Sequence, residues 1–75
     1  MKELAEHMAK ALVIERGAVE VTQTVEGENI ELKLKVAPED MGKVIGRQGR
    51  IAKAMRVVLK AAAARDGKKC NLEID

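Results

Sequence analysis

Residues 43–56 read KVIGRQGRIAKAMR, and the rest of the chain is organised around this segment. Its centre is the link GRQG, from Gly46 to Gly49. Because glycine lacks a Cβ, the backbone can turn sharply at both ends of this link and approach another molecule closely. The amides of Gly49 and Arg50 then open a helix, where unpaired N–H groups and the helix dipole favour an anion such as phosphate. The segment therefore predicts an anion-binding loop between two helices.

Basic side chains are concentrated around this loop. The formal net charge of the 75-residue chain is only +2, so attraction to a polyanion must arise from where the charges lie rather than from their number. The cations expected to take part are Lys43, Arg47, Arg50, Lys53 and Arg56.

The hexapeptide VIGRQG at 44–49 resembles the VIGxxG signature of K-homology (KH) domains, whose GxxG loop clamps about four nucleotides of single-stranded nucleic acid. The whole chain is similar to the small bacterial single-KH proteins of the KhpA type. This similarity includes the run APED at 37–40 and the alanine-rich helix after the loop. The resemblance implies one KH domain over residues 1–75, with RNA as its ligand.

The expected function is the binding of single-stranded RNA in a shallow groove beside the loop. Phosphates would meet amides and cations, while bases would lie on Ile45 and Ile51 and meet polar groups along residues 30–36. The chain has no Phe, Tyr or Trp for bases to stack on, so binding is expected to be weak, salt-sensitive and of low sequence selectivity. This favours a global RNA-binding or RNA-chaperone role. The expected RNA-binding residues are Lys43, Val44, Ile45, Gly46, Arg47, Gln48, Gly49, Arg50, Ile51, Lys53 and Arg56.

The composition argues against several other classes of protein. Serine is absent and Cys70 is the only cysteine, so we expect no disulfide framework and a reducing, cytoplasmic location. No apolar stretch is long enough to span a bilayer or to form a signal peptide. The spacing of Gly42, Gly46 and Gly49 matches neither the P-loop nor the dinucleotide-binding motif. We therefore expect no enzymatic activity, cofactor, metal, small-molecule substrate or membrane partner.

Hydrophobic periodicity predicts the other elements. They are a helix from Lys2 to about Arg16, strands at 19–25 and 30–36, a short helix from 37 to Gly46, a helix at 50–65 and a strand at 70–74. Gly17 is expected to stop the first helix. The polar Gln23 points inward in its strand and is therefore expected near a sheet edge. Cys70 faces the core and is expected to be a buried, inert thiol.

The order of these elements predicts an α+β fold, α-β-β-α-α-β. The first two strands form an antiparallel hairpin, whereas two helices separate the second strand from the third and leave room for parallel pairing. We expect a three-stranded mixed sheet with the helices packed on one face. In the family that the chain resembles, this order is that of the type II KH fold.

The helix at 50–65 presents three faces. The face expected to meet the sheet carries Ile51, Ala52, Met55, Val58, Leu59 and Ala62, and a basic stripe carries Lys53, Arg56 and Lys60. The third face is a ridge of small residues, Ala54, Val57, Ala61 and Ala64. An exposed ridge of this kind allows two helices to approach closely, so it is a candidate dimer interface, with another copy or another KH-containing protein. Alternatively, alanine is there for its helix propensity.

Two other functions remain open at this point. A helix-turn-helix that binds duplex DNA also joins two helices through a glycine-bearing turn, but the first helix here is very short and the second carries alanine and valine where base-reading side chains are needed. A protein–protein interaction module would use the helix at 50–65 for docking and leave the loop without a ligand.

Overall fold

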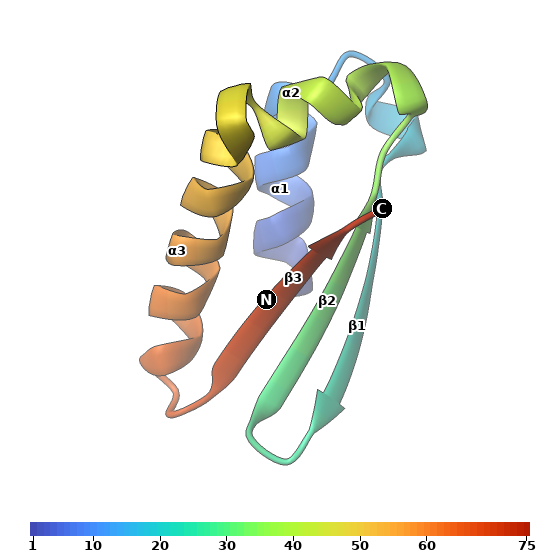
Figure 1. Cartoon of the computed structure of the whole chain (residues 1–75). Coiled ribbons are helices and arrows are strands. Elements are labelled where there is room, and N and C mark those ends of the chain that lie inside the picture. The colour runs from blue at the N-terminus through green and yellow to red at the C-terminus, as the bar shows by residue number, and fades with distance from the viewer.

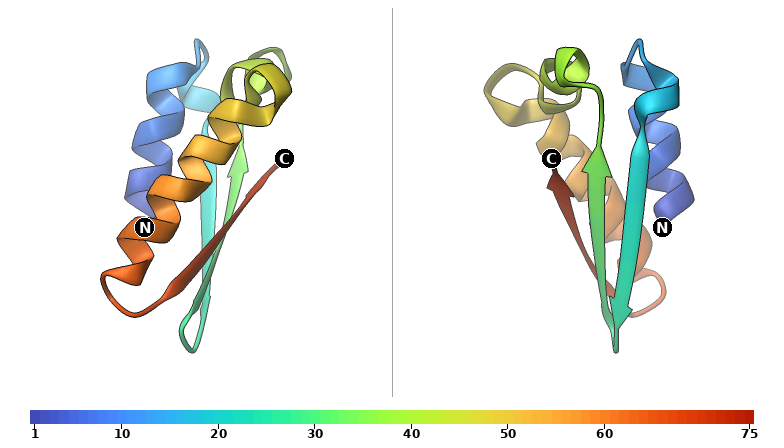
Figure 2. Two further views of the ribbon diagram at one scale, coloured as in Figure 1. Left: turned by 60° about the vertical axis from the view of Figure 1, so that its left-hand side comes forward. Right: turned by 90° about the vertical axis from the view of Figure 1, so that its right-hand side faces the viewer.

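A computed structural model describes residues 1–75. The helices α1, α2 and α3 lie on one face of a three-stranded sheet, as Figures 1 and 2 show. In chain order the elements are α1 (Lys2–Leu12), the 3-10 turn η1 (Arg16–Ala18), β1 (Glu20–Glu26), β2 (Asn29–Lys35), the 3-10 turn η2 (Pro38–Asp40), α2 (Met41–Ile45), the 3-10 turn η3 (Arg47–Gly49), α3 (Arg50–Ala64) and β3 (Lys69–Ile74). The predicted α-β-β-α-α-β order is confirmed, and the fold is type II KH-like.

The sheet has the order β1-β2-β3 and is mixed. β1 and β2 are antiparallel and are joined by a two-residue turn, with Glu26 opposite Asn29. β2 and β3 are parallel, with Ile30 opposite Cys70. β2 is thus the central strand, and β1 and β3 are the two edges.

The core lies between the helices and the inner face of this sheet. In β2, buried and exposed residues alternate strictly, as the hydrophobic pattern predicts for a strand with one wet face. The largest fully buried apolar side chains are Leu32, Leu34, Val44 and Leu59. On α1, the buried positions are Ala5 and Ala9, whose small side chains let this helix lie close to its neighbours.

The first helix is shorter than predicted. α1 ends at Leu12 and Val13 is extended (φ −95°, ψ 159°), so the helix neither reaches Arg16 nor stops at Gly17. Two β-branched residues, Val13 and Ile14, follow the last helical residue, and Val13 turns its side chain into the core. Gly17 lies instead in the turn η1.

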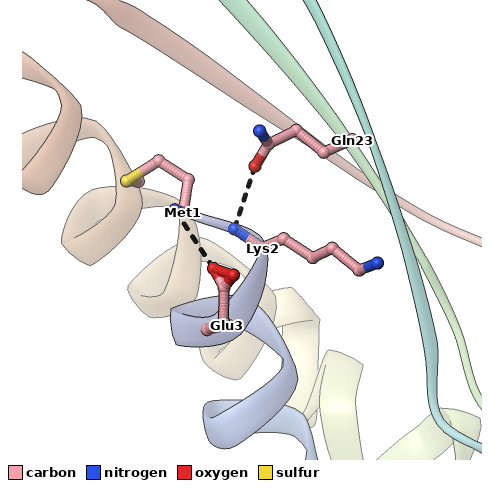
Figure 3. A network of polar contacts seen from close by, with 4 residues as sticks. All are labelled: Met1, Lys2, Glu3 and Gln23. Carbon is pink, nitrogen blue, oxygen red and sulfur yellow. Dashed lines mark hydrogen bonds and ion pairs between the residues drawn. The ribbon is translucent and has the colours of Figure 1, made fainter.

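The expectation for Gln23 is confirmed, because it lies exposed on the edge strand β1. Its Oε1 accepts a hydrogen bond of 3.0 Å from the backbone N–H of Lys2, as Figure 3 shows. The first N–H groups of a helix have no partner within the helix. This polar residue in an otherwise apolar row therefore caps the start of α1 from the neighbouring strand.

The core-facing side of α3 is rotated slightly from the predicted one. Val58, expected in the core, is 46% exposed, whereas Ala63 is buried. The reason is that α3 packs against α1 and α2 as well as β3, and a small residue such as Ala63 suits the close approach of another helix.

Candidate nucleic-acid interface

The link between α2 and α3 is a single 3-10 turn held by unusual backbone angles. Three of its four residues have positive φ, namely Gly46 (+76°), Gln48 (+56°) and Gly49 (+73°). With ψ at 175°, Gly46 occupies a region that is essentially restricted to glycine. At Gly46 a Cβ would also lie 2.6 Å from Cγ1 of Ile51. Gly46 is therefore fixed both by its backbone angles and by its contact with α3.

The amides expected to bind an anion are not the ones that are free. The N–H of Gly49 donates to the carbonyl of Gly46 at 3.1 Å, and the N–H of Arg50 donates to the carbonyl of Arg47. By contrast, the N–H groups of Arg47 and Gln48 have no partner within the chain, and both residues are exposed. The two residues between the glycines, rather than the second glycine and its successor, thus carry the unpaired donors.

The five predicted cations differ in what else they contact. No hydrogen bond or ion pair within the chain occupies the side chains of Arg47 and Lys53, and both residues are exposed. Arg50 Nη2 lies 3.3 Å from Gln48 Oε1, which holds the guanidinium over the loop. Lys43 Nζ lies 3.8 Å from Asp40 Oδ1. Arg56 Nε donates to the carbonyl of Leu72 at 3.1 Å and so covers the free edge of β3.

The predicted apolar contacts also differ in how exposed they are. Val44 has no exposed surface, so it anchors α2 in the core and cannot touch a ligand. Ile45, its neighbour, is 37% exposed. Ile51 is half-buried beneath Gly46. Of the three aliphatic residues, Ile45 offers the most surface beside the loop.

The strand that runs along the helix after the loop is β3, at the edge of the sheet. β2 is the central strand, so its backbone groups pair with a neighbour on each side, and α3 packs chiefly along β3. The helix that follows the loop is therefore bordered by an edge strand. The sequence pattern could not reveal this, because both strands alternate in the same way.

Asp40 is the one buried charged residue, and it is not among the predicted site residues. Its side chain is 2% exposed, and Oδ2 accepts a hydrogen bond of 2.9 Å from the backbone N–H of Glu15. Asp40 precedes α2, so this bond ties the segment after α1 to the helix that leads into the loop. This role could not be predicted from the sequence, since a carboxylate near a helix start is common on a protein surface as well.

Cys70 is buried, as predicted. Burial raises the pKa of its thiol above 9.0; the positive charge of the chain's amino group opposes this rise, and the negative charge of Glu31 adds to it. The thiol is therefore protonated at neutral pH. Histidine, cysteine and carboxylate side chains nowhere come together as a group of three that could hold a metal ion. Nor is any helix long and apolar enough to cross a membrane.

The small-residue ridge of α3 lies on the surface. Ala54, Ala61 and Ala64 are exposed, and Val57 is 60% exposed. The displaced Val58 lies next to it and enlarges the apolar surface.

Comparison with known proteins extends over almost the whole chain. A sequence model described as "KhpA/KhpB, KH domain" matches residues 2–74. A protein of Clostridium perfringens named RNA-binding protein KhpA is 58% identical over 74 residues, which cover 99% of either chain. The protein of the same name from Clostridium acetobutylicum is 55% identical over 74 residues, again 99% of either chain. That from Aquifex aeolicus is 45% identical over 75 residues, covering 99% of this chain and 94% of the relative.

Proposed function

The chain belongs to the KhpA/KhpB family of KH domains, and on this premise we propose that it binds single-stranded RNA, with residues 1–75 acting as one KH domain. The relatives are named as RNA-binding proteins, and neither those names nor the description of the family denotes an enzyme. These names support RNA as the proposed partner.

The observation that carries the proposal is the pair of unpaired, exposed amides between Gly46 and Gly49. Backbone N–H groups hydrogen-bond phosphate oxygens without regard to base sequence. The free cations Arg47 and Lys53 lie beside and just after this pair, where they add charge attraction to the same phosphates. The loop would in this way clamp the RNA backbone at the N-terminal end of α3.

Beside the clamp, bases would rest on the exposed side chain of Ile45 and over the edge of β3. The chain has no Phe, Tyr or Trp, so the stacking on these side chains that is worth about 1–3 kcal/mol per base in other single-strand binders is missing. Affinity would come mostly from phosphate contacts and would be weak, salt-sensitive and of low sequence selectivity. Such binding suits a global RNA-binding or RNA-chaperone role in the cytoplasm.

Weak binding by one domain gains from pairing two domains. The ridge of Ala54, Val57, Ala61 and Ala64 on α3 would form the contact, with a second copy or with another KH-containing protein. Support comes from its exposure, since 60% of Val57 and 46% of Val58 are exposed to solvent. The same ridge supports the second candidate, a protein–protein interaction module in which the loop has no ligand. The hypothesis of a helix-turn-helix that binds duplex DNA has less support, because the first helix of that motif would be α2, which has only five residues.

The clamp is tested by Gly49→Asp. A Cβ at Gly49 meets no atom within 4 Å, unlike one at Gly46, so the fold should survive while a carboxylate repels the phosphates. Fluorescence anisotropy with a labelled oligouridylate at low salt should show a loss of affinity of about tenfold or more, or about 1.4 kcal/mol.

The matched control for this change is Gly27→Asp. Gly27 also has a positive φ (+60°) and open space around it, so the same residue is introduced at a similar backbone cost in the β1–β2 turn. Figure 1 shows that this turn lies at the other end of the molecule. If both variants bind the oligonucleotide as the unaltered protein does, the loop is no clamp and the interaction module is the better description.

The dimer is tested by Val57→Glu. A charge in the middle of an apolar contact should convert a dimer to a monomer, which light scattering measures as a halving of the mass. Val25→Glu is the matched control, because Val25 is an exposed valine (49%) on β1, away from α3. An unaltered protein that is monomeric in the absence and presence of other KH proteins would rule out this interface.

A further inference from the structure

A groove of about 370 Å³ lies between the C-terminal half of α3 and the start of β3. We call it the lysine groove, because three of its six lining residues are lysines. The six lining residues are Lys60, Ala64, Lys68, Lys69, Cys70 and Asn71. Figure 1 shows that the turn between α3 and β3 is at the end of the molecule opposite the link between α2 and α3. The groove is therefore separate from the GxxG loop.

The backbone fixes where two of these lysines lie. After Gly67 (φ +70°), the N–H of Lys68 reaches back to the carbonyl of Ala63 at 3.0 Å, which is the capping bond of a Schellman motif. The N–H of Lys69 donates to the carbonyl of Glu28 at 2.8 Å and begins the pairing of β3 with β2. Lys68 and Lys69 thus stand on a well-held turn rather than on a loose end.

The charges of the groove are not neutralised within the chain. The four ion pairs involve other groups, so the ammonium groups of Lys60, Lys68 and Lys69 have no carboxylate within 4.0 Å. Asp66 lies in the adjoining turn but does not line the groove, and Glu31 is engaged by Asn71 Nδ2 at 3.1 Å. Three lysines around a concave surface with small walls, Ala64 and Cys70, suit a compact, strongly charged anion such as phosphate.

A basic row connects the groove with the loop. Lys53, Arg56 and Lys60 follow one another on α3 at spacings of three and four residues, and therefore lie on one side of the helix. From Gly49 to Lys60 the helix rises by about 16 Å, at 1.5 Å per residue. At the 3.4 Å per nucleotide of a stacked strand this is about five nucleotides. A GxxG loop clamps about four, so the groove begins where that segment ends.

We propose that the lysine groove is a second phosphate-binding site, which holds the backbone of the same RNA beyond the segment clamped by the loop. This inference rests on the proposed function, because it extends the path of the same ligand. It makes the footprint of one chain longer than four nucleotides. It also places a sequence-independent contact at the far end of α3.

The test compares oligouridylates of four and ten nucleotides. The variant K60Q/K68Q/K69Q should lose about tenfold in affinity for the ten-nucleotide strand and less than twofold for the four-nucleotide strand. With three fewer phosphate contacts, the slope of log affinity against log salt should fall by about 2 for the longer strand only. The control K10Q/K33Q/K35Q removes the same charge from α1 and from the outer face of the sheet, and should change neither affinity by more than twofold.

The outcomes separate this inference from the proposed function. If the unaltered protein binds neither strand in low salt, both are wrong. If it binds and the groove variant matches the control at both lengths, the lysine groove is wrong while the loop stands. A variant that lost affinity equally at both lengths would also count against a second site. Should the triple variant fail to fold by circular dichroism, K60Q and K68Q alone must each lower the slope of log affinity against log salt by about 0.7 for the longer strand only, or the inference fails.

Discussion

Two exposed turns of this chain use glycine at positive φ, and they differ in what surrounds the glycine. In the hairpin turn, Gly27 has φ +60° and no atom within 4 Å of where a Cβ would stand. In the GxxG loop, Gly46 has φ +76°, and its missing Cβ leaves room for the side chain of Ile51. A positive φ is thus common to both turns and lets the chain reverse direction. Only in the GxxG loop does the glycine also allow close packing, here against Ile51 of the helix that follows.

The two turns also differ in charge and in how their backbone is used. Glu26 and Glu28 flank Gly27 of the hairpin turn, and the carbonyl of Glu28 accepts the N–H of Lys69. The GxxG loop instead carries two unpaired amides and the side chain of Arg47. One turn completes the sheet, and the other leaves donors free for a partner.

Among the substitutions that test this difference between the two turns, the largest expected effect is on the free energy of unfolding. Gly46→Ala places a Cβ 2.6 Å from Ile51 Cγ1 in a backbone region that alanine avoids, so the free energy of unfolding should fall by about 2–5 kcal/mol. At Gly27 an alanine would only have to adopt the left-handed conformation, so Gly27→Ala should lower the free energy of unfolding by about 1–2 kcal/mol. Urea denaturation measures both. Equal losses would show that packing on Ile51 does not distinguish the two glycines.

A smaller effect is expected from the anchor behind the GxxG loop. Asp40→Ala removes the acceptor of the Glu15 N–H and should lower the free energy of unfolding by about 1–3 kcal/mol. Asp40→Asn keeps an acceptor oxygen and should recover part of this loss. The hairpin turn has no such anchor, so Glu28→Ala should stay within about 0.5 kcal/mol. Thermal unfolding followed by circular dichroism measures all three; an Asp40→Ala protein as stable as Glu28→Ala would show that the buried bond is not an anchor.

The smallest expected effect is on the salt dependence of RNA affinity. Lys53→Ala removes one free cation beside the GxxG loop and should reduce the slope of log affinity against log salt by about 0.7, the value for one phosphate on a single strand. In the hairpin turn, Glu28→Lys adds a cation and should leave the slope unchanged within about 0.2 for a four-nucleotide strand, which does not reach the lysine groove beside this turn. Titrations at several salt concentrations provide both slopes. An equal change in the two variants would mean that overall charge, not its place, controls binding.

Much of this architecture could be predicted because it depends on periodicity. Alternation predicted β2 and its buried face, and the 3.6-residue period predicted α3. Glycine and proline marked the short helix and the GxxG loop. These signals are local in the sequence, so they can be recognised without any knowledge of tertiary structure.

What could not be predicted depends on contacts between distant residues. Val13 leaves the helix because the core receives its side chain, and Asp40 is buried because the N–H of Glu15 lies against it. The free amides of Arg47 and Gln48 follow from the positive φ angles of Gly46, Gln48 and Gly49, which no composition rule specifies. The predicted site residues Val44 and Arg56 prove to be engaged in the core and at the edge of β3, respectively, for the same reason.

The pairing of β2 with β3 bears on the order of events during synthesis. Ile30 lies opposite Cys70, so forty residues of chain must leave the ribosome before these two positions can meet. α3 is made before the strand along which it chiefly packs, so the part of its apolar side that β3 covers remains unshielded until that strand emerges. Because this pairing joins residues far apart in the sequence, the chain should fold more slowly than a bundle of helices of equal size.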